Sequence, residues 1–260
     1  MFPLRDDNPQ ILRPIATCLL VACNLAAWFY FQGAGTEPAL STSVCRLGLI
    51  PGVLLQRIPD GLPLALGPGT VCRTGEVPAW QTAVTSMFLH GGWFHLLGNL
   101  WFLWIFGNNV EDAMGHLRFT AFYLLCGLAA AGAQVASHPD SAVPMVGASG
   151  AVGGVMGAYV LLYPRVHVHL LMVLGFYITR IAVPAVLMLG YWFVLQFVGG
   201  LAGSGGSGGG VAFWAHVGGF VAGAVLLPVF RDSELLAMHP YHGWRPRGLP
   251  TRSWRRIRRF

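Results

Sequence analysis

The chain has 260 residues, of which 55% are hydrophobic and only 10% are charged. A soluble domain carries roughly a quarter charged residues, so this composition excludes an ordinary soluble globule, and its hydrophobicity excludes intrinsic disorder. All 16 Lys-or-Arg positions are Arg and the formal net charge is +6, which leaves a membrane protein with a basic tail as the class to test.

Six apolar segments predict membrane-spanning helices, and we expect an all-α polytopic bundle. The fourth segment is short against the roughly 20 residues that a span needs. A further apolar stretch, Val166–Thr179, has 14 residues and suits a re-entrant or interfacial segment better than a span. No cleavable signal peptide is expected, because no small-residue cleavage site follows the first apolar run. The predicted spans are Pro14–Phe31, Trp93–Val110, Arg118–Ala136, Ser149–Tyr163, Ala182–Val198 and Val211–Phe230.

The distribution of Arg predicts the orientation of these spans. With the N-terminus inside, 13 of the 16 Arg fall on the inner side, as the positive-inside rule requires. Seven of them lie between Arg245 and Arg259 without an acid, which favours contact with anionic lipid headgroups over nucleic acid. We expect a multi-pass plasma-membrane protein with both termini cytoplasmic. Its parts would be a segment 1–13, a six-span domain 14–231 and a tail 232–260.

Two outer connections carry distinct compositions. The segment 32–92 is long, rich in Pro and Gly and partly apolar, so we expect it to fold onto or into the outer leaflet. The segment 199–210 is almost entirely Gly and Ser, which is compatible with a mobile flap or with a plain linker. Cys45 and Cys72 lie in the first connection and could pair if it faces an oxidising compartment.

Two spans combine a polar residue with a row of small ones. Polar groups inside spans are costly and therefore mark functional positions. Small residues at helical spacing let two membrane helices touch backbone to backbone, which would bring a hydroxyl and an imidazole within reach. Both polar residues lie 14 residues from the inner end of their span, at a common height of about 21 Å. The two rows are Ser149, Gly153 and Gly157, and His216, Gly219 and Gly223.

A serine beside a neutral histidine is the minimal unit for nucleophilic catalysis, with the imidazole as the base. No Asp or Glu lies inside a predicted span, so we expect a dyad of Ser149 and His216. Acyl transfer also needs donors for the oxyanion. His95 and Asn99 are four residues apart on one helix face and can donate, as can the backbone N–H of Ser149 at a helix start.

The other polar residues receive simpler interpretations. His90 lies five residues before His95 and so points elsewhere, and we expect it to tie the long connection to the helix. His90, His95 and His216 could ligate zinc, but an HExxH motif and a nearby carboxylate base are absent from the sequence, so we expect neither metal nor cofactor. Single polar residues in spans are interpreted as helix–helix hydrogen bonds, and these are Asn24, Gln134 and Gln196.

Three motifs on three spans, in this order and spacing, are similar to those of the rhomboid intramembrane serine proteases. The resemblance extends over roughly Trp80 to Phe230 and includes an acidic turn after the second span. It implies a six-span bundle, transmembrane proteins as substrates, and entry of the substrate beside the fifth span and the Gly/Ser segment. It also implies a nucleophile (Ser149), a general base (His216) and an oxyanion hole (His95, Asn99 and the Ser149 amide). The motifs are His90-x4-His95-x3-Asn99, Gly147-Ala148-Ser149-Gly150, Ala215-His216-x2-Gly219 and the turn Val110-Glu111-Asp112.

Two positions depart from the family pattern. Gln81 follows Trp80 where members often carry Arg, and Gly153 stands where some members place an aromatic residue against the catalytic histidine. Two alternative functions stay open at this point. One is a non-catalytic rhomboid-like protein that binds membrane clients, and the other is a small transporter, although the predicted spans carry no acidic residue to couple an ion.

Overall fold

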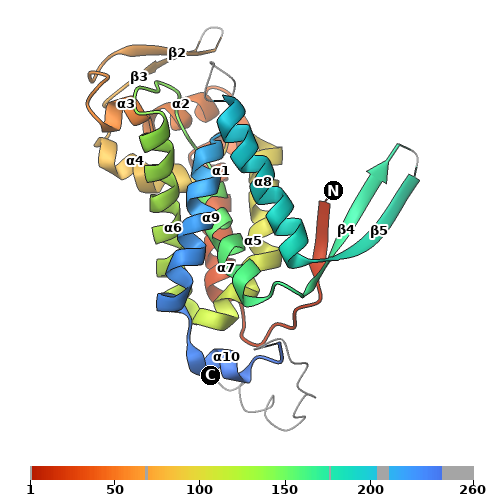
Figure 1. The fold of residues 1–260 in the computed structure, drawn as a ribbon. Coiled ribbons are helices and arrows are strands. Elements are labelled where there is room, and N and C mark those ends of the chain that lie inside the picture. Colours follow the sequence, from red (N-terminus) through yellow and green to blue (C-terminus); the bar gives the residue numbers. More distant parts are fainter. Residues whose placement is uncertain (1, 68–69, 176, 204–210, 242–260) are drawn as a thin grey trace.

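The computed structural model describes residues 2–67, 70–175, 177–203 and 211–241, and it is mostly helical (Figure 1). Each segment that the sequence marks as a span contains a long helix. The main differences are at the second, which extends four residues beyond the predicted Val110, and at the fifth, which ends five residues beyond the predicted Val198. These helices are α1 (Ile15–Tyr30), α5 (Trp93–Met114), α6 (His116–Ser137), α7 (Ser149–Leu162), α8 (Ala185–Gly203) and α9 (Phe213–Phe230).

Length and apolar composition qualify α6, α8 and α9 as helices that can cross a membrane. α1 and α7 are apolar but shorter, with 16 and 14 residues. The helices pack as one bundle around α7, in which 10 of 14 residues are buried. This arrangement confirms the predicted membrane-protein class and places the helix that starts at Ser149 in the middle of the protein.

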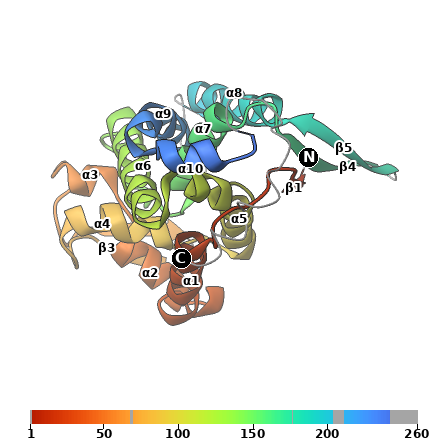
Figure 2. The ribbon, with the colours of Figure 1, turned by 90° about the horizontal axis from the view of Figure 1, so that it is seen from below.

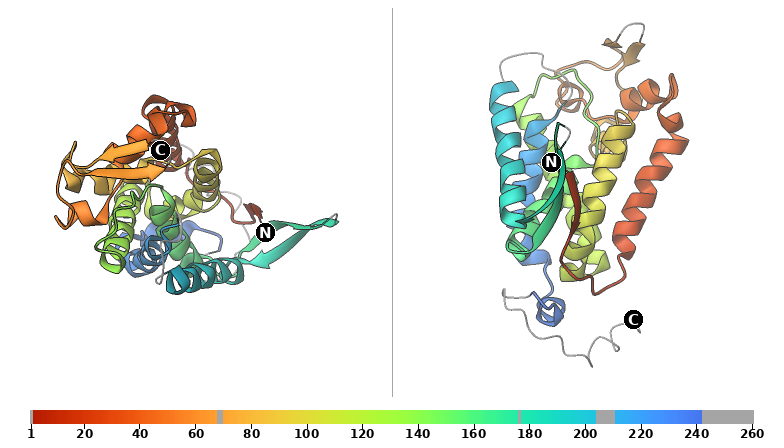
Figure 3. Two further views of the ribbon diagram at one scale, coloured as in Figure 1. Left: turned by 90° about the horizontal axis from the view of Figure 1, so that it is seen from above. Right: turned by 90° about the vertical axis from the view of Figure 1, so that its right-hand side faces the viewer.

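The expectation of an all-α fold is incomplete, because the chain also forms strands. β1 (Phe2–Asp6), β4 (His167–Leu174) and β5 (Tyr177–Pro184) make an antiparallel sheet in the order β1-β4-β5. The stretch 166–179, predicted as a re-entrant or interfacial segment, supplies β4 and the start of β5. Its residues alternate, with Val168 and Leu170 buried and His167 exposed, which is the period of a strand. Figure 3 shows the sheet beside α5 and α8.

The long connection between α1 and α5 is folded and gathers at one end of the bundle, opposite α10 (Ser233–Met238), as Figures 1 and 2 show. Gln32 closes it at its base, since its side-chain amide donates to the His90 carbonyl oxygen (2.6 Å) and accepts from the His90 N–H (2.8 Å). The connection contains α2 (Ala39–Leu47), α3 (Pro51–Leu54), β2 (Pro63–Gly67), β3 (Thr70–Arg73), α4 (Ala79–Thr85) and the 3-10 turns Gly33–Gly35 and Ser86–Phe88.

Three sequence predictions fall wholly or partly outside the described residues. Cys45 is disulfide-bonded, but the side chain of Cys72 is not described, so their pairing stays a prediction. The Gly/Ser segment is described only as far as Gly203, where α8 ends, and again from 211. The Arg-rich part of the tail also lies outside the described residues.

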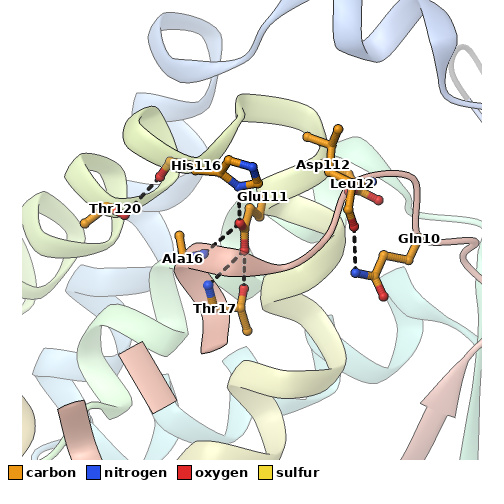
Figure 4. Close-up of polar contacts among 8 residues, drawn as sticks. All are labelled: Gln10, Leu12, Ala16, Thr17, Glu111, Asp112, His116 and Thr120. Atoms are coloured by element: carbon orange, nitrogen blue, oxygen red, sulfur yellow. Dashed lines mark hydrogen bonds and ion pairs between the residues drawn. The ribbon is translucent and has the colours of Figure 1, made fainter. Parts of the chain in front are cut away.

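Glu111 and Asp112, predicted as a turn after the second span, instead continue α5. Their carboxylates face the start of α1 (Figure 4). Glu111 is buried and accepts the N–H groups of Ala16 (2.8 Å) and Thr17 (2.9 Å), which have no acceptor inside the first turn of α1. Asp112 accepts the N–H groups of the two residues at 11 and 12, just before α1. These carboxylates therefore fix α1 to α5.

Asp6 joins β1 to the bundle. Its carboxyl accepts from the Asn109 side-chain amide (2.9 Å) and from the Tyr159 hydroxyl. Burial raises the pKa of Asp6 to about 6, although the hydrogen bond from Tyr159 acts in the opposite direction. The N-terminal segment is thus attached to the bundle through a carboxyl group that titrates within the pH range of stability measurements.

Helices α7 and α9 touch backbone to backbone, as the rows of small residues predict. A Cβ added to Gly153 would lie 3.1 Å from the His216 carbonyl oxygen. A Cβ on Gly219 would collide with the Gly150 carbonyl, and one on Gly223 with the Gly154 carbonyl. The two predicted faces therefore meet, with glycine at the closest points.

Gly223→Ala should lower the free energy of unfolding by about 1–3 kcal/mol, because the methyl group forces α9 away from α7. The matched control is Gly132→Ala on α6, where an added Cβ meets nothing within 4 Å. The control should be neutral or stabilising, since Ala is the better helix former. Thermal unfolding in detergent measures both, and equal melting temperatures would contradict the close packing.

Asp6→Asn should remove a pH dependence of stability. The folded chain holds the Asp6 proton up to a pH of about 6, whereas the unfolded chain releases it near pH ~4. A raised carboxyl pKa therefore contributes its stability below pH ~4 and loses it as the pH rises through about 6. Wild-type melting temperatures should fall relative to those of Asp6→Asn across this range. Parallel curves for the two proteins would refute the assignment.

Candidate active site

Ser149 is the first residue of α7 and is half-buried at the end of a loop. The loop is held by the Gly147 N–H, which donates to the Ser86 carbonyl oxygen (2.9 Å). Gly147 has φ +131°, a conformation that other residues rarely adopt. A small pocket lined by Gly147, Ser149 and Ala212, among others, opens beside the hydroxyl. The hydroxyl thus stands at a helix start with open space next to it.

His216, in the first turn of α9, reaches this hydroxyl. Its Nε2 lies 2.8 Å from Ser149 Oγ, and its Nδ1 lies 2.8 Å from Oε1 of Gln196 on α8. A neutral imidazole has one donor and one acceptor nitrogen. The amide oxygen accepts only, so Nδ1 carries the proton and Nε2 is left to accept the serine hydroxyl. The predicted pair of Ser149 and His216 is therefore extended by Gln196 into a hydrogen-bonded chain of three side chains, which come from α7, α9 and α8.

Gln196 is the residue whose function the sequence interpretation missed. It does form a helix–helix hydrogen bond, as expected, but to the histidine of the site. Trp192, one turn earlier on α8, places its ring 5.8 Å from that of His216 at an interplanar angle of 37°. The ring lies next to Gly153, where a Cβ would be in ordinary van der Waals contact with it at 3.8 Å. The signal in the sequence is the spacing of four between a Trp and a Gln in an otherwise apolar helix.

His95 approaches the same loop from α5. Its Nδ1 accepts the Gly91 N–H (3.2 Å), which leaves the proton on Nε2. A Cβ on Gly147 would lie 2.7 Å from His95 Nε2 and 3.5 Å from Ser149 Oγ. The Nε2–H donor therefore lies beside Gly147, close to the hydroxyl, and the absence of a side chain at 147 keeps that space open.

Asn99 is buried one turn further along α5. Its side-chain amide donates to the His95 carbonyl oxygen (3.0 Å), so in this structure it bonds within its own helix. The same nitrogen carries a second hydrogen. The structure thus brings Ser149, His216 and His95 together, with Asn99 adjacent to His95 and no described hydrogen bond from it to Ser149.

His90 is buried beside His95, with the two rings edge to face at 5.1 Å. Burial lowers the pKa of His90 to about 3, with a smaller effect from His95 in the same direction, so the ring is neutral at physiological pH. The expected tie to the long connection exists, but it runs through the backbone of His90 and the side chain of Gln32. Among the described residues, no group of three or more His, Cys, Asp and Glu side chains is placed to hold a metal ion.

Comparison with known proteins agrees with these motifs. A family model described as the Rhomboid domain matches residues 78–233. The chain is 44% identical over 84 residues to the chloroplastic rhomboid-like protein 11 of Arabidopsis thaliana, covering 32% of this chain and 30% of that protein. It is 34% identical over 130 residues to the rhomboid protease GluP of Bacillus subtilis (strain 168), covering 48% and 24%.

A second protein of the same bacterium, the putative rhomboid protease YdcA, is 32% identical over 159 residues, which cover 60% of this chain and 67% of that protein. The match to the first two relatives named above spans less than a third of the length of either. The residues matched by the family model include α5 to α9, which carry every residue of the site.

Proposed function

This chain belongs to the rhomboid family, and we propose that it is an intramembrane serine endopeptidase that hydrolyses peptide bonds in or next to the transmembrane segments of other membrane proteins. The observation that carries the proposal is the 2.8 Å contact between Ser149 Oγ and His216 Nε2. It lies between two apolar helices whose backbones touch. A polar pair at this position is costly in a membrane, and nucleophilic catalysis accounts for it.

The hydrogen bonds place the His216 proton on Nδ1 and leave Nε2 free to accept a proton, which is the state that acylation of Ser149 requires. Ser149 Oγ attacks the carbonyl carbon of the scissile peptide bond while His216 Nε2 takes the hydroxyl proton. The C–N bond then breaks, and His216 gives that proton to the leaving amine. In the second half, water attacks the resulting ester with His216 again as the base. The carboxylic acid leaves, and the Ser149 hydroxyl is restored.

The developing oxyanion needs donors that are already in place. His95 supplies an Nε2–H directed at the loop of Gly147, and the Ser149 amide lies at a helix start, where N–H groups have no acceptor inside the helix. Asn99 would supply the second hydrogen of its side-chain amide, while the first keeps its bond to the His95 carbonyl. These donors belong to α5 and α7, so the oxyanion would form between two helices.

A transmembrane helix resists proteolysis because its backbone groups bond to each other and lipid supplies no water. The pocket beside Ser149 offers polar groups next to the long connection, since Ser86 and Met87 of that connection also line it. Substrates would be segments whose helix unwinds near this end. We place the six spans in the plasma membrane with both termini cytoplasmic, a topology supported by the 13 of 16 Arg on the inner side.

Ser149→Ala should abolish cleavage of a model transmembrane substrate in proteoliposomes, and His216→Ala should do the same, since each removes one partner of the proton transfer. Both variants should keep the melting temperature of the wild type within a few degrees. Labelling of Ser149 by a fluorophosphonate gives an independent readout. Binding of the substrate without cleavage or labelling would instead support a non-catalytic client-binding protein, and solute flux insensitive to Ser149→Ala would support a transporter.

Asn99→Ala should slow turnover by roughly 10²-fold, as expected for one oxyanion donor. Asn24→Ala is the matched control. Asn24 is also buried and also donates to the carbonyl four residues earlier (2.7 Å to Leu20 O), but it lies on α1. The control should keep the turnover of the wild type per folded molecule. An equal loss of turnover in both variants would mean that Asn99 only stabilises its own helix and does not donate to the oxyanion.

A further inference from the structure

α8 is the least buried of the long helices, with only three of its 19 residues buried. Its contacts with α9 are concentrated on one side. Phe193 packs against Phe220 (ring centroids 4.8 Å apart), and Phe197 packs against Trp214 (5.9 Å). Between these aromatic contacts, Gln196 reaches Nδ1 of His216. The least buried of the long helices thus supplies the only described acceptor for that proton.

We propose that Gln196 is a positioning residue that fixes the tautomer of His216 and makes the dyad depend on the contact of α8 with α9. This inference rests on the proposed function. With Gln196 in place, Nδ1 is the donor and Nε2 faces Ser149 Oγ as an acceptor. Without an acceptor at Nδ1, the proton can move to Nε2, and the ring then offers Ser149 a donor instead of a base.

An amide suits this position better than a carboxylate would. It accepts the Nδ1–H bond without adding a charge to an apolar helix, where an ionised group would be costly. It also cannot take the proton, so its contribution is orientation alone. Among the described residues, the titratable side chain that acts on His216 is His95 of α5, which lies beside Gly147.

Displacement of α8 would separate Gln196 from His216 and remove Trp192 from the ring at the same time, because both side chains come from one helix turn. A substrate helix that pushes α8 aside would therefore meet an inactive histidine. Catalysis would start only after α8 has returned to α9. The position of α8 would thus determine both whether the substrate can enter the site and which nitrogen of His216 carries the proton.

The first test compares Gln196→Met with Gln134→Met, a matched glutamine of α6 that does not contact the site. Gln196→Met should lower kcat by about 10- to 100-fold with little change in KM, the range typical for loss of a group that orients a working histidine. Gln196→Glu restores an acceptor, so it should recover most of the activity. Its carboxylate should also move the acid limb of the kcat/KM profile up by about one pH unit. Gln134→Met should match the wild type in both.

A second variant tests the dependence on α8. Phe197→Ala weakens the α8–α9 contact at a residue that does not touch His216, and Val194→Ala, on the exposed side of α8, is its control. Phe197→Ala should lower kcat in the wild-type background and have a much smaller effect in the Gln196→Met background. Strictly additive effects of the two substitutions on kcat would show that the contact of α8 with α9 does not act through Gln196 and His216.

A readout without substrate separates this inference from the proposed function. Nitrogen-15 NMR of labelled histidine, with His216 assigned by its loss in His216→Ala, should show Nδ1 protonated in the wild type and a mixture of tautomers in Gln196→Met. That result in a protein that does not cleave would keep the inference and reject the protease. Ser149-dependent cleavage with unchanged kcat and tautomer in Gln196→Met would reject the inference and keep the protease.

Discussion

The separation between the backbones of α7 and α9 controls the rest of the site. Glycines at 154, 157, 219 and 223 remove the side chains that would otherwise hold the two helices apart. The short distance between the two helix axes lets the serine side chain reach the imidazole. Since Ser149 and His216 both lie within one turn of their helix starts, a small shift of either helix along its axis would also part them. In lipid no hydrophobic effect drives two helices together, so close van der Waals contact between α7 and α9 both stabilises the pair and fixes the distance between Ser149 and His216.

Much of this arrangement could be predicted from the sequence, because the signals were local. The rows Ser149–Gly153–Gly157 and His216–Gly219–Gly223 fix two helix faces, and the spacing of His95 and Asn99 fixes a third. The contribution of α8 could not be predicted in this way. Gln196 is one polar residue in a helix, and only the tertiary packing shows which atom it meets. The same holds for Trp192, which occupies the space beside Gly153 from another helix.

The acidic residues show a second limit of sequence reasoning. The sequence predicts Glu111 and Asp112 as a turn after the second span, but they continue α5 and bind N–H groups at and just before the start of α1. A carboxylate can be buried there because it meets backbone donors and the positive end of a helix dipole. The strands of residues 2–6 and 167–184 were missed for another reason. A sheet formed from both ends of the sequence needs pairing between distant segments, which hydropathy does not reveal.

The clasp between Gln32 and His90 has a consequence for how this protein tolerates change. Both hydrogen bonds lie at the base of the connection, so everything from 33 to 89 leaves and returns at one fixed point next to His95. Lengthening a loop that is closed at its base costs little, since the entropy of closure grows only with the logarithm of its length. The connection can thus accept insertions before Ser86, whose carbonyl oxygen holds the loop of Gly147, while the closure at its base keeps His90 and His95 in register.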